Sequence, residues 1–117
     1  MSTLAKTPLQ PCRKDTPKLS AQEIQAALQE LPDWQHLAMD TIDVLVRTFP
    51  FGSYAEAVHF TNQIAALADA ADHHPAITLE WGKVTISWWT HTIGGLHHND
   101  LVMAARCDEA NAGQASH

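Results

Sequence analysis

Positively charged residues are scarce in this sequence. Seven lysines and arginines stand against thirteen aspartates and glutamates, so the formal net charge is −6 and the sequence pI is near 5.6. Arg13 and Lys14 form the only adjacent basic pair. Binding to nucleic-acid phosphates requires clustered lysine and arginine. We therefore expect no nucleic-acid surface on this protein.

Cysteines and long apolar runs are equally rare. The two cysteines, Cys12 and Cys107, lie near opposite ends without metal-type CxxC spacing, which favours free thiols in a reducing compartment. No apolar run approaches the roughly 18 residues that a membrane-spanning helix needs. The first residues also lack the apolar stretch of a secretory signal. These absences predict a cytoplasmic protein that does not contact a membrane.

What remains has the composition of a single globular domain. The 117 residues are 45% hydrophobic and 17% charged, and a chain of this length can bury a core without disulfides or a structural metal. Residues 1–18 hold three of the six prolines and show no periodicity, so we expect a flexible arm there. The domain then occupies residues 19–110, and residues 111–117 are expected to fray.

Hydrophobic periodicity divides this domain into helices and strands. Ser20 and Ser53 are each followed three residues later by glutamate, the signature of a helix start. In the strand after residue 41, the apolar face is formed by Ile42, Val44 and Val46. The predicted order is a helix over 20–31, strands over 34–37 and 41–51, a helix over 53–71, strands over 77–81 and 84–88, and a helix starting near 97–99. This order predicts an α+β fold, with a four-stranded antiparallel sheet and three helices packed on one face.

The last two strands form a hairpin in this prediction. Gly82-Lys83 as a two-residue loop suits a type II′ turn, and it places Trp81 opposite Val84 on an apolar face. Trp81 and Trp88 are then core residues. Extended to the open end, the same register brings His74 opposite His91.

Histidine is concentrated in one part of the chain. Five of the eight histidines lie between Asp69 and Asp100. Adjacent His73 and His74 do not have the spacing typical of zinc ligands, although His91 and an acid could complete a set. A purely structural role at a helix end is the second alternative. Because histidine titrates near neutral pH, a cluster of three with nearby acids favours general acid–base chemistry.

These residues resemble the pterin-4a-carbinolamine dehydratase family. The family pattern is met by Asp69, His73, His74, Pro75, Trp81, His91 and Asp100. The neighbouring segments are also similar to the family: Trp88-Trp89-Thr90-His91-Thr92, Gly94-Gly95-Leu96 and residues 60–65. The resemblance covers residues 19–108, most of the chain.

The resemblance implies an enzyme, a hydro-lyase that dehydrates 4a-hydroxytetrahydropterin to quinonoid dihydropterin in tetrahydropterin recycling. It implies acid–base roles for His73 and His91 and substrate positioning by His74, without a metal or an organic cofactor. Which histidine is the acid and which the base stays open. The residues expected to bind substrate or support the histidines are Asp69, Asp72, Trp89, Thr90 and Asp100. Of these, Asp100 is expected to cap the last helix and support His91.

The resemblance also leaves a second function open. Members of the family act as partners of transcription factors, and similar folds assist assembly, so a binding module without catalysis is the alternative. The family implies a homodimer or homotetramer, and an aromatic amino acid hydroxylase or another protein is a further possible partner. One position departs from the family, because His97 stands where threonine or serine would cap the last helix. Imidazole is a poorer cap, and His97 and His98 are expected to be bystanders.

Overall fold

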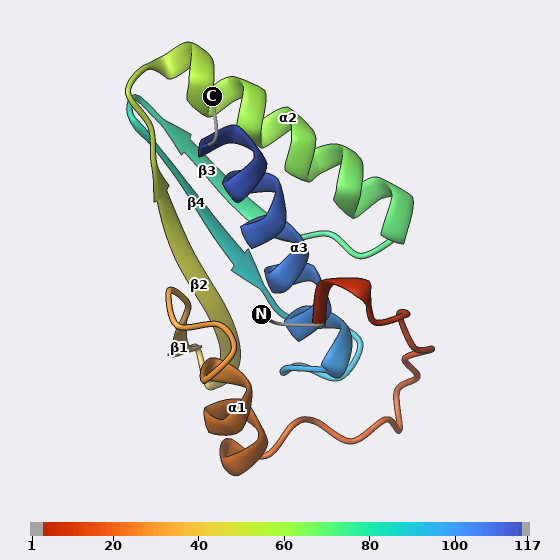
Figure 1. Ribbon diagram of the computed structural model, residues 1–117. Helices are drawn as coiled ribbons and strands as arrows, with labels where there is room; N and C mark the ends of the chain where they lie inside the picture. Colours follow the sequence, from red (N-terminus) through yellow and green to blue (C-terminus); the bar gives the residue numbers. More distant parts are fainter. Residues whose placement is uncertain (1–3, 116–117) are drawn as a thin grey trace.

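The computed structural model describes residues 4–115 and contains one antiparallel sheet with the strand order β1-β2-β4-β3. The strands are β1 (Gln35–Met39), β2 (Ile42–Pro50), β3 (Ala76–Glu80) and β4 (Lys83–Trp88). The helices are α1 (Ala21–Leu28), α2 (Tyr54–Ala71) and α3 (His98–Ala115), preceded by the short 3-10 helix η1 (Leu4–Lys6). Helices α2 and α3 lie across one face of the sheet (Figure 1). The predicted α+β fold class is confirmed.

The helix starts follow the sequence signals. The Ser20 hydroxyl accepts the Glu23 backbone N–H at 3.1 Å, and the Ser53 hydroxyl accepts the Glu56 N–H at the same distance. Each serine therefore satisfies one of the amides that a helix start leaves without a partner. The second of these caps fixes the start of α2, the helix that leads into the histidine segment.

The face of β2 that meets the helices differs from the prediction. Leu45 and Phe49 are fully buried and pair with Trp88 and Val84 of β4 in the core. The sequence pointed to Ile42, Val44 and Val46 as the apolar face, and this was wrong for the helix-covered side. The strand is apolar on both faces, and Val44 on the opposite face is buried too, so alternation alone could not select the face that the helices cover.

A partly buried ion pair accompanies this orientation of β2. Arg47 shares the covered face, and its Nη1 donates to Asp108 of α3 at 2.6 Å. Trp34 Nε1 donates to the same carboxylate oxygen at 2.8 Å. Burial raises the pKa of Asp108, although Trp34 and Arg47 both act to lower it. A charged residue is tolerated on the core side because its charge has a partner there.

The hairpin register also differs from the prediction. Glu80 pairs with Lys83, so the two loop residues are Trp81 and Gly82. Gly82 has φ 79° at the second central position, as a type II turn requires, and not at the first as in type II′. Trp81 therefore lies outside the ladder and is 72% exposed, whereas we expected it in the core.

The register change replaces every predicted cross-strand partner and moves the histidine end, but it keeps the apolar residues on one face. Leu79 pairs with Val84 instead of Ile86, a shift of two residues along β4, and an even shift keeps each side chain on its face of the sheet. The ladder stops at Ala76, which pairs with Ser87. Its extension would place His74 opposite Trp89, so the predicted pairing of His74 with His91 was wrong.

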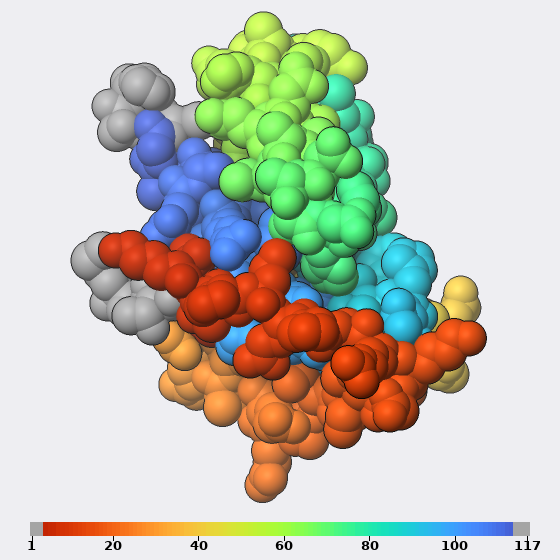
Figure 2. Space-filling model, turned by 90° about the vertical axis from the view of Figure 1, so that its right-hand side faces the viewer, coloured from red at the N-terminus to blue at the C-terminus, as the bar shows by residue number. Residues whose placement is uncertain are grey.

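The chain before α1 packs along α3. Ala5 of η1 is buried, and Arg106 Nε donates to its carbonyl oxygen at 3.0 Å. Gln10 and Asn99 exchange two hydrogen bonds of 2.8 and 2.7 Å. In Figure 2 this segment, coloured red, forms a band across the face shown, between α2 and α1. Helix α3 continues to Ala115, beyond residue 110, where we expected fraying.

Both cysteines are free thiols, as expected. Burial raises the pKa of the Cys107 thiol to about 12, so this cysteine is a core residue and not a nucleophile. Within residues 4–115, no helix combines the length and apolarity needed to cross a membrane.

Candidate active site

The end of α2 turns the histidine segment into the molecule. Asp72 adopts the left-handed conformation with φ 51° and ψ 41°, and its N–H bonds back to the carbonyls of Ala68 and Asp69. The His73 N–H then donates to the Ala68 carbonyl at 3.1 Å. This is the bonding of a Schellman-type helix end, in which one left-handed residue reverses the chain. The backbone of Asp72 makes this turn, while its side chain is exposed.

His73 is held from two directions. Its Nε2 lies 2.6 Å from Asp100 Oδ1, and its ring stacks on the Trp88 indole with centroids 5.4 Å apart and planes 20° apart. Only 17% of the side chain remains exposed. A carboxylate only accepts, so Nε2 carries the proton in this pair and Nδ1 is the acceptor nitrogen of the ring. The ring is therefore fixed in orientation and tautomer.

Asp100 is the fully buried centre of this arrangement. Its Oδ2 accepts the Thr90 hydroxyl at 2.7 Å and the His97 backbone N–H at 2.9 Å. The predicted capping of the last helix is thus present. The predicted support of His91 is not, because the carboxylate bonds to His73 instead. Spacing along the sequence could not distinguish these two histidines as its partner.

His74 points toward α2. Its Nε2 lies 3.4 Å from Asp69 Oδ1, and both side chains are largely exposed. The two residues line a hollow of about 530 Å³ together with Pro75, Ile77 and alanines of α2. Sites for small molecules typically have volumes of about 300–1,000 Å³. The hollow has the volume of a small-molecule site, and of the three histidines only His74 lines it.

His91 lies in the loop after β4 and packs on Trp89. The two ring centroids are 4.7 Å apart, and the planes are tilted by 53°. The loop is closed by hydrogen bonds between Thr90 and Gly95, and by the Gly94 N–H donating to the His91 carbonyl. Gly94 has φ 61°, which favours glycine at this tight turn. The His91 side chain is exposed, as a residue that meets a substrate can be.

The three histidines belong to two segments that one carboxylate joins. Asp100 bonds both His73 and Thr90, which directly precede His74 and His91 in the chain. The two segments are thereby tied together, while the three imidazoles have different partners. The sequence missed Trp88 as the surface on which His73 stacks. Its place on the covered face of β4 was predicted, but only the tertiary structure brings the histidine over it.

The alternative roles for the cluster can be compared with this geometry. In the part of the chain from residue 4 to 115, no three His, Cys, Asp or Glu side chains are grouped so that they could hold a metal ion. The helix-end alternative applies in part, since His73 follows the last turn of α2. It does not explain the contacts of His73 with Asp100 and Trp88, which belong to other elements.

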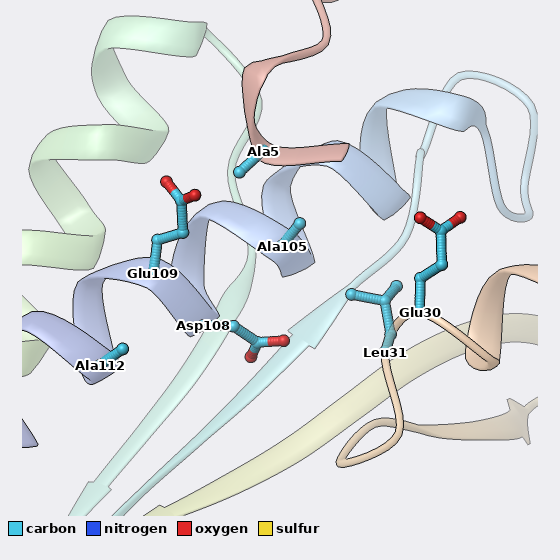
Figure 3. A pocket seen from close by; sticks show the side chains of 7 residues that line it. All are labelled: Ala5, Glu30, Leu31, Ala105, Asp108, Glu109 and Ala112. Carbon is cyan, nitrogen blue, oxygen red and sulfur yellow. The ribbon is translucent and has the colours of Figure 1, made fainter. Parts of the chain in front are cut away.

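A second hollow lies between η1, α3 and the end of α1, and it is not part of the histidine region. Figure 3 shows Asp108, Glu109 and Glu30 among the side chains around it. Its volume is about 220 Å³, below the usual range for a small-molecule site. Asp108 is already bonded to Arg47 and Trp34, so its carboxylate serves the fold.

Curated relatives match nearly the whole chain. A protein of Marinobacter nauticus, provisionally named a pterin-4-alpha-carbinolamine dehydratase, is 48% identical over 109 residues, which cover 93% of this chain and 98% of that protein. A protein of Syntrophotalea carbinolica with the same provisional name is 47% identical over 108 residues, which cover 92% of this chain and 96% of that protein.

Solved structures show the same fold. The crystal structure of a transcriptional coactivator/pterin dehydratase from Brucella melitensis matches with a TM-score of 0.74 and 28% identity, over 81% of this chain and 99% of that one. A pterin dehydratase-like protein described as a RuBisCO assembly factor of the alpha-carboxysome matches with a TM-score of 0.59 and 29% identity, over 68% of this chain and 89% of that one. The family model for pterin 4 alpha carbinolamine dehydratase matches residues 17–110. The chain therefore belongs to the pterin 4 alpha carbinolamine dehydratase family.

Proposed function

We propose that this protein dehydrates 4a-hydroxytetrahydropterin to quinonoid dihydropterin by histidine acid–base catalysis. The observation that carries the proposal is the buried Asp100, which fixes His73 and ties its segment to the one that carries His91. Membership of the family supports the substrate class. The hollow beside His74 and Asp69 supplies space for a flat ring next to this segment.

The reaction needs two proton movements. The C4a–O bond breaks as the leaving hydroxyl receives a proton and departs as water. The N5–H proton is removed, and its bonding electrons form the C4a=N5 double bond. Protons and electrons balance without an oxidant or a reductant. Two imidazoles can perform these transfers near neutral pH, and such groups contribute about 10²–10⁴-fold each to a rate.

His73 and His91 are assigned these proton transfers in our proposal, and His74 positions the ring. The bond from His73 Nε2 to Asp100 leaves Nδ1 as the nitrogen that exchanges a proton with substrate. Trp89, which packs on His91, forms an aromatic wall for the pterin.

The test is an assay of carbinolamine dehydration on a His73→Ala, His91→Ala double variant. We expect kcat/KM to fall by at least about 10³-fold, because both proton transfers lose their side chain. His59→Ala provides the matched control, since His59 is exposed on α2, outside the cluster. Unchanged turnover in the double variant would end the catalytic assignment.

We also propose that the protein forms a homodimer or homotetramer through α2. The outer side of this helix exposes alanines, and a hollow of about 390 Å³ there is lined by Gln63, Ala66, Leu67, Ala70 and Ala110. Small side chains allow a second helix to approach closely.

A binding role without catalysis is the alternative function. The likeness to the protein described as a RuBisCO assembly factor favours it, since that protein shares the fold. The same dehydration assay on the unmodified protein separates the two. Absence of turnover with correctly folded protein would favour the binding role.

A further inference from the structure

The residue that precedes α3 is a histidine used as a helix cap. His97 is 5% exposed, and its Nδ1 accepts the Asn99 backbone N–H at 3.0 Å. In return, the His97 backbone N–H donates to Asp100 Oδ2 at 2.9 Å. The Asp100 N–H donates to the His97 carbonyl at 2.9 Å. The cap and the carboxylate that holds His73 are therefore one hydrogen-bonded unit.

A histidine cap differs from a threonine or serine cap in one chemical respect. A hydroxyl oxygen accepts a hydrogen bond at any pH, whereas an imidazole nitrogen accepts only when it carries no proton. Nδ1 of His97 faces an N–H group, so it is unprotonated in this geometry. A proton on Nδ1 would place two donors against each other and remove the cap.

The surroundings of His97 favour the neutral ring. Burial lowers its pKa, and the carboxylate of Asp100 opposes this effect. His98 on α3 and His73 from the end of α2 lower the pKa further. The nearby segment before α1 contributes the Gln10 backbone, which bonds the Asn99 side chain, and Lys18, which lies over Gly95.

We propose that His97 is a positioning residue: its neutral imidazole caps α3 and keeps Asp100 against His73, and protonation of Nδ1 releases both contacts in acid. The site thereby contains an acid-sensitive clamp that a threonine or serine at the same position would lack. The effect on turnover rests on the proposed dehydratase function. The effect on the fold does not.

The direction of the stability change follows from linkage. The pKa of His97 is lower in the folded protein than its ordinary value of 6.5, so the unfolded chain binds the proton first. As the pH falls below 6.5, the unfolded state gains protons and the folded state is destabilised until its own pKa is reached. The stabilising effect of the cap is fully present above pH 6.5 and is lost in acid.

The test compares thermal unfolding of the wild-type protein and His97→Thr at about pH 7.5 and about pH 5.5, on either side of the ordinary histidine pKa. We expect the wild type to lose at least about 4 °C more in Tm than the variant over this interval. His59→Gln is the matched control and should keep the wild-type loss, since His59 is exposed on α2 and does not act on His97. An equal loss in wild type and His97→Thr, or removal of the loss by His59→Gln instead, overturns the proposal.

Two further measurements separate this inference from the proposed function. NMR of labelled protein should show His97 Nδ1 unprotonated at neutral pH and the Asn99 N–H signal moving as that ring titrates. In the dehydration assay, the acid limb of log(kcat/KM) should approach a slope of about 2 in wild type, because protonation of a catalytic histidine and protonation of His97 both lower activity. In His97→Thr only the catalytic histidine is left to titrate, so the slope should be about 1. Wild-type protein with no turnover at any pH contradicts the dehydratase function, while Tm and NMR still decide the role of His97.

Discussion

Asp100 is the residue on which the candidate site depends most. Its carboxylate is fully buried and accepts three hydrogen bonds, from His73, Thr90 and the His97 backbone. A buried carboxylate is costly unless its oxygens are bonded, and here both oxygens have partners. The same group therefore stabilises the start of α3 and orients a histidine.

Replacing this carboxylate by an amide tests both roles. In Asp100→Asn, one oxygen acceptor becomes an NH₂ donor, so a buried N–H of His97 or of His73 loses its acceptor. We expect a loss of about 1–3 kcal/mol in the free energy of unfolding, measured by urea denaturation. We also expect at least about a 10²-fold loss of dehydratase kcat/KM.

Thr90 supplies the graded control for that experiment. Thr90→Ser keeps the hydroxyl bonded to Asp100 and should stay close to wild type, whereas Thr90→Val removes one of the three bonds and should lie between wild type and Asp100→Asn. Equal stability of wild type and Asp100→Asn would contradict the stabilising role of the Asp100 carboxylate.

At the scale of elements, the end of α2 decides where the histidines go. The helix ends in a left-handed residue, and this reversal turns His73 toward Trp88 and Asp100. Aspartate tolerates the left-handed conformation better than most residues, and glycine tolerates it best. The sequence signal of Pro75 correctly indicated a helix end near Ala71, but not the direction of the chain after it.

Two substitutions at Asp72 measure how strongly the fold depends on a left-handed residue at this position. Asp72→Gly should leave the free energy of unfolding within a few tenths of a kcal/mol of wild type or raise it, because glycine accepts a φ of 51° without strain. Asp72→Val should lower it by about 1–2 kcal/mol, the cost of a left-handed side-chain-bearing residue. Chemical denaturation provides the measurement, and similar values for the two variants would show that the left-handed turn is not required.

At the scale of the whole molecule, the outer surface of α2 is the proposed contact between subunits. Its exposed alanine Ala70 lines a hollow together with Gln63 and Leu67 of α2 and Ala110 of α3. The helix buries Phe60, Ile64 and Ala68 on its inner side, so Ala70 is not needed for the core of one chain.

A long charged side chain on this surface should separate the subunits. We expect Ala70→Arg to give a monomer in sedimentation or light-scattering measurements, with the wild type a dimer or a tetramer. Ala26→Arg, on the exposed side of α1, is the control and should keep the wild-type mass. A monomeric wild type, or an unchanged mass in Ala70→Arg, would contradict the proposed contact.

The elements of the fold were predictable because their signals are local. Serine caps, the 3.6-residue period of the helices and the alternation of the strands are all read from neighbouring residues, and they gave the correct order. The face of β2 and the hairpin loop were predicted wrongly. In the first case both faces are apolar, and in the second a single glycine fits two turn types with loops one residue apart.

The sequence by itself determined the class of the fold, its helix and strand order, and the family pattern around His73, His74 and His91. These properties depend on residue type and on spacing along the chain, which the sequence contains directly. Only the tertiary structure decided which residues touch: Asp100 with His73 and not His91, Arg47 with Asp108, and His97 as the cap of α3. Such contacts join segments that are distant in sequence, or depend on which way a buried ring is turned, and packing of the whole core fixes both.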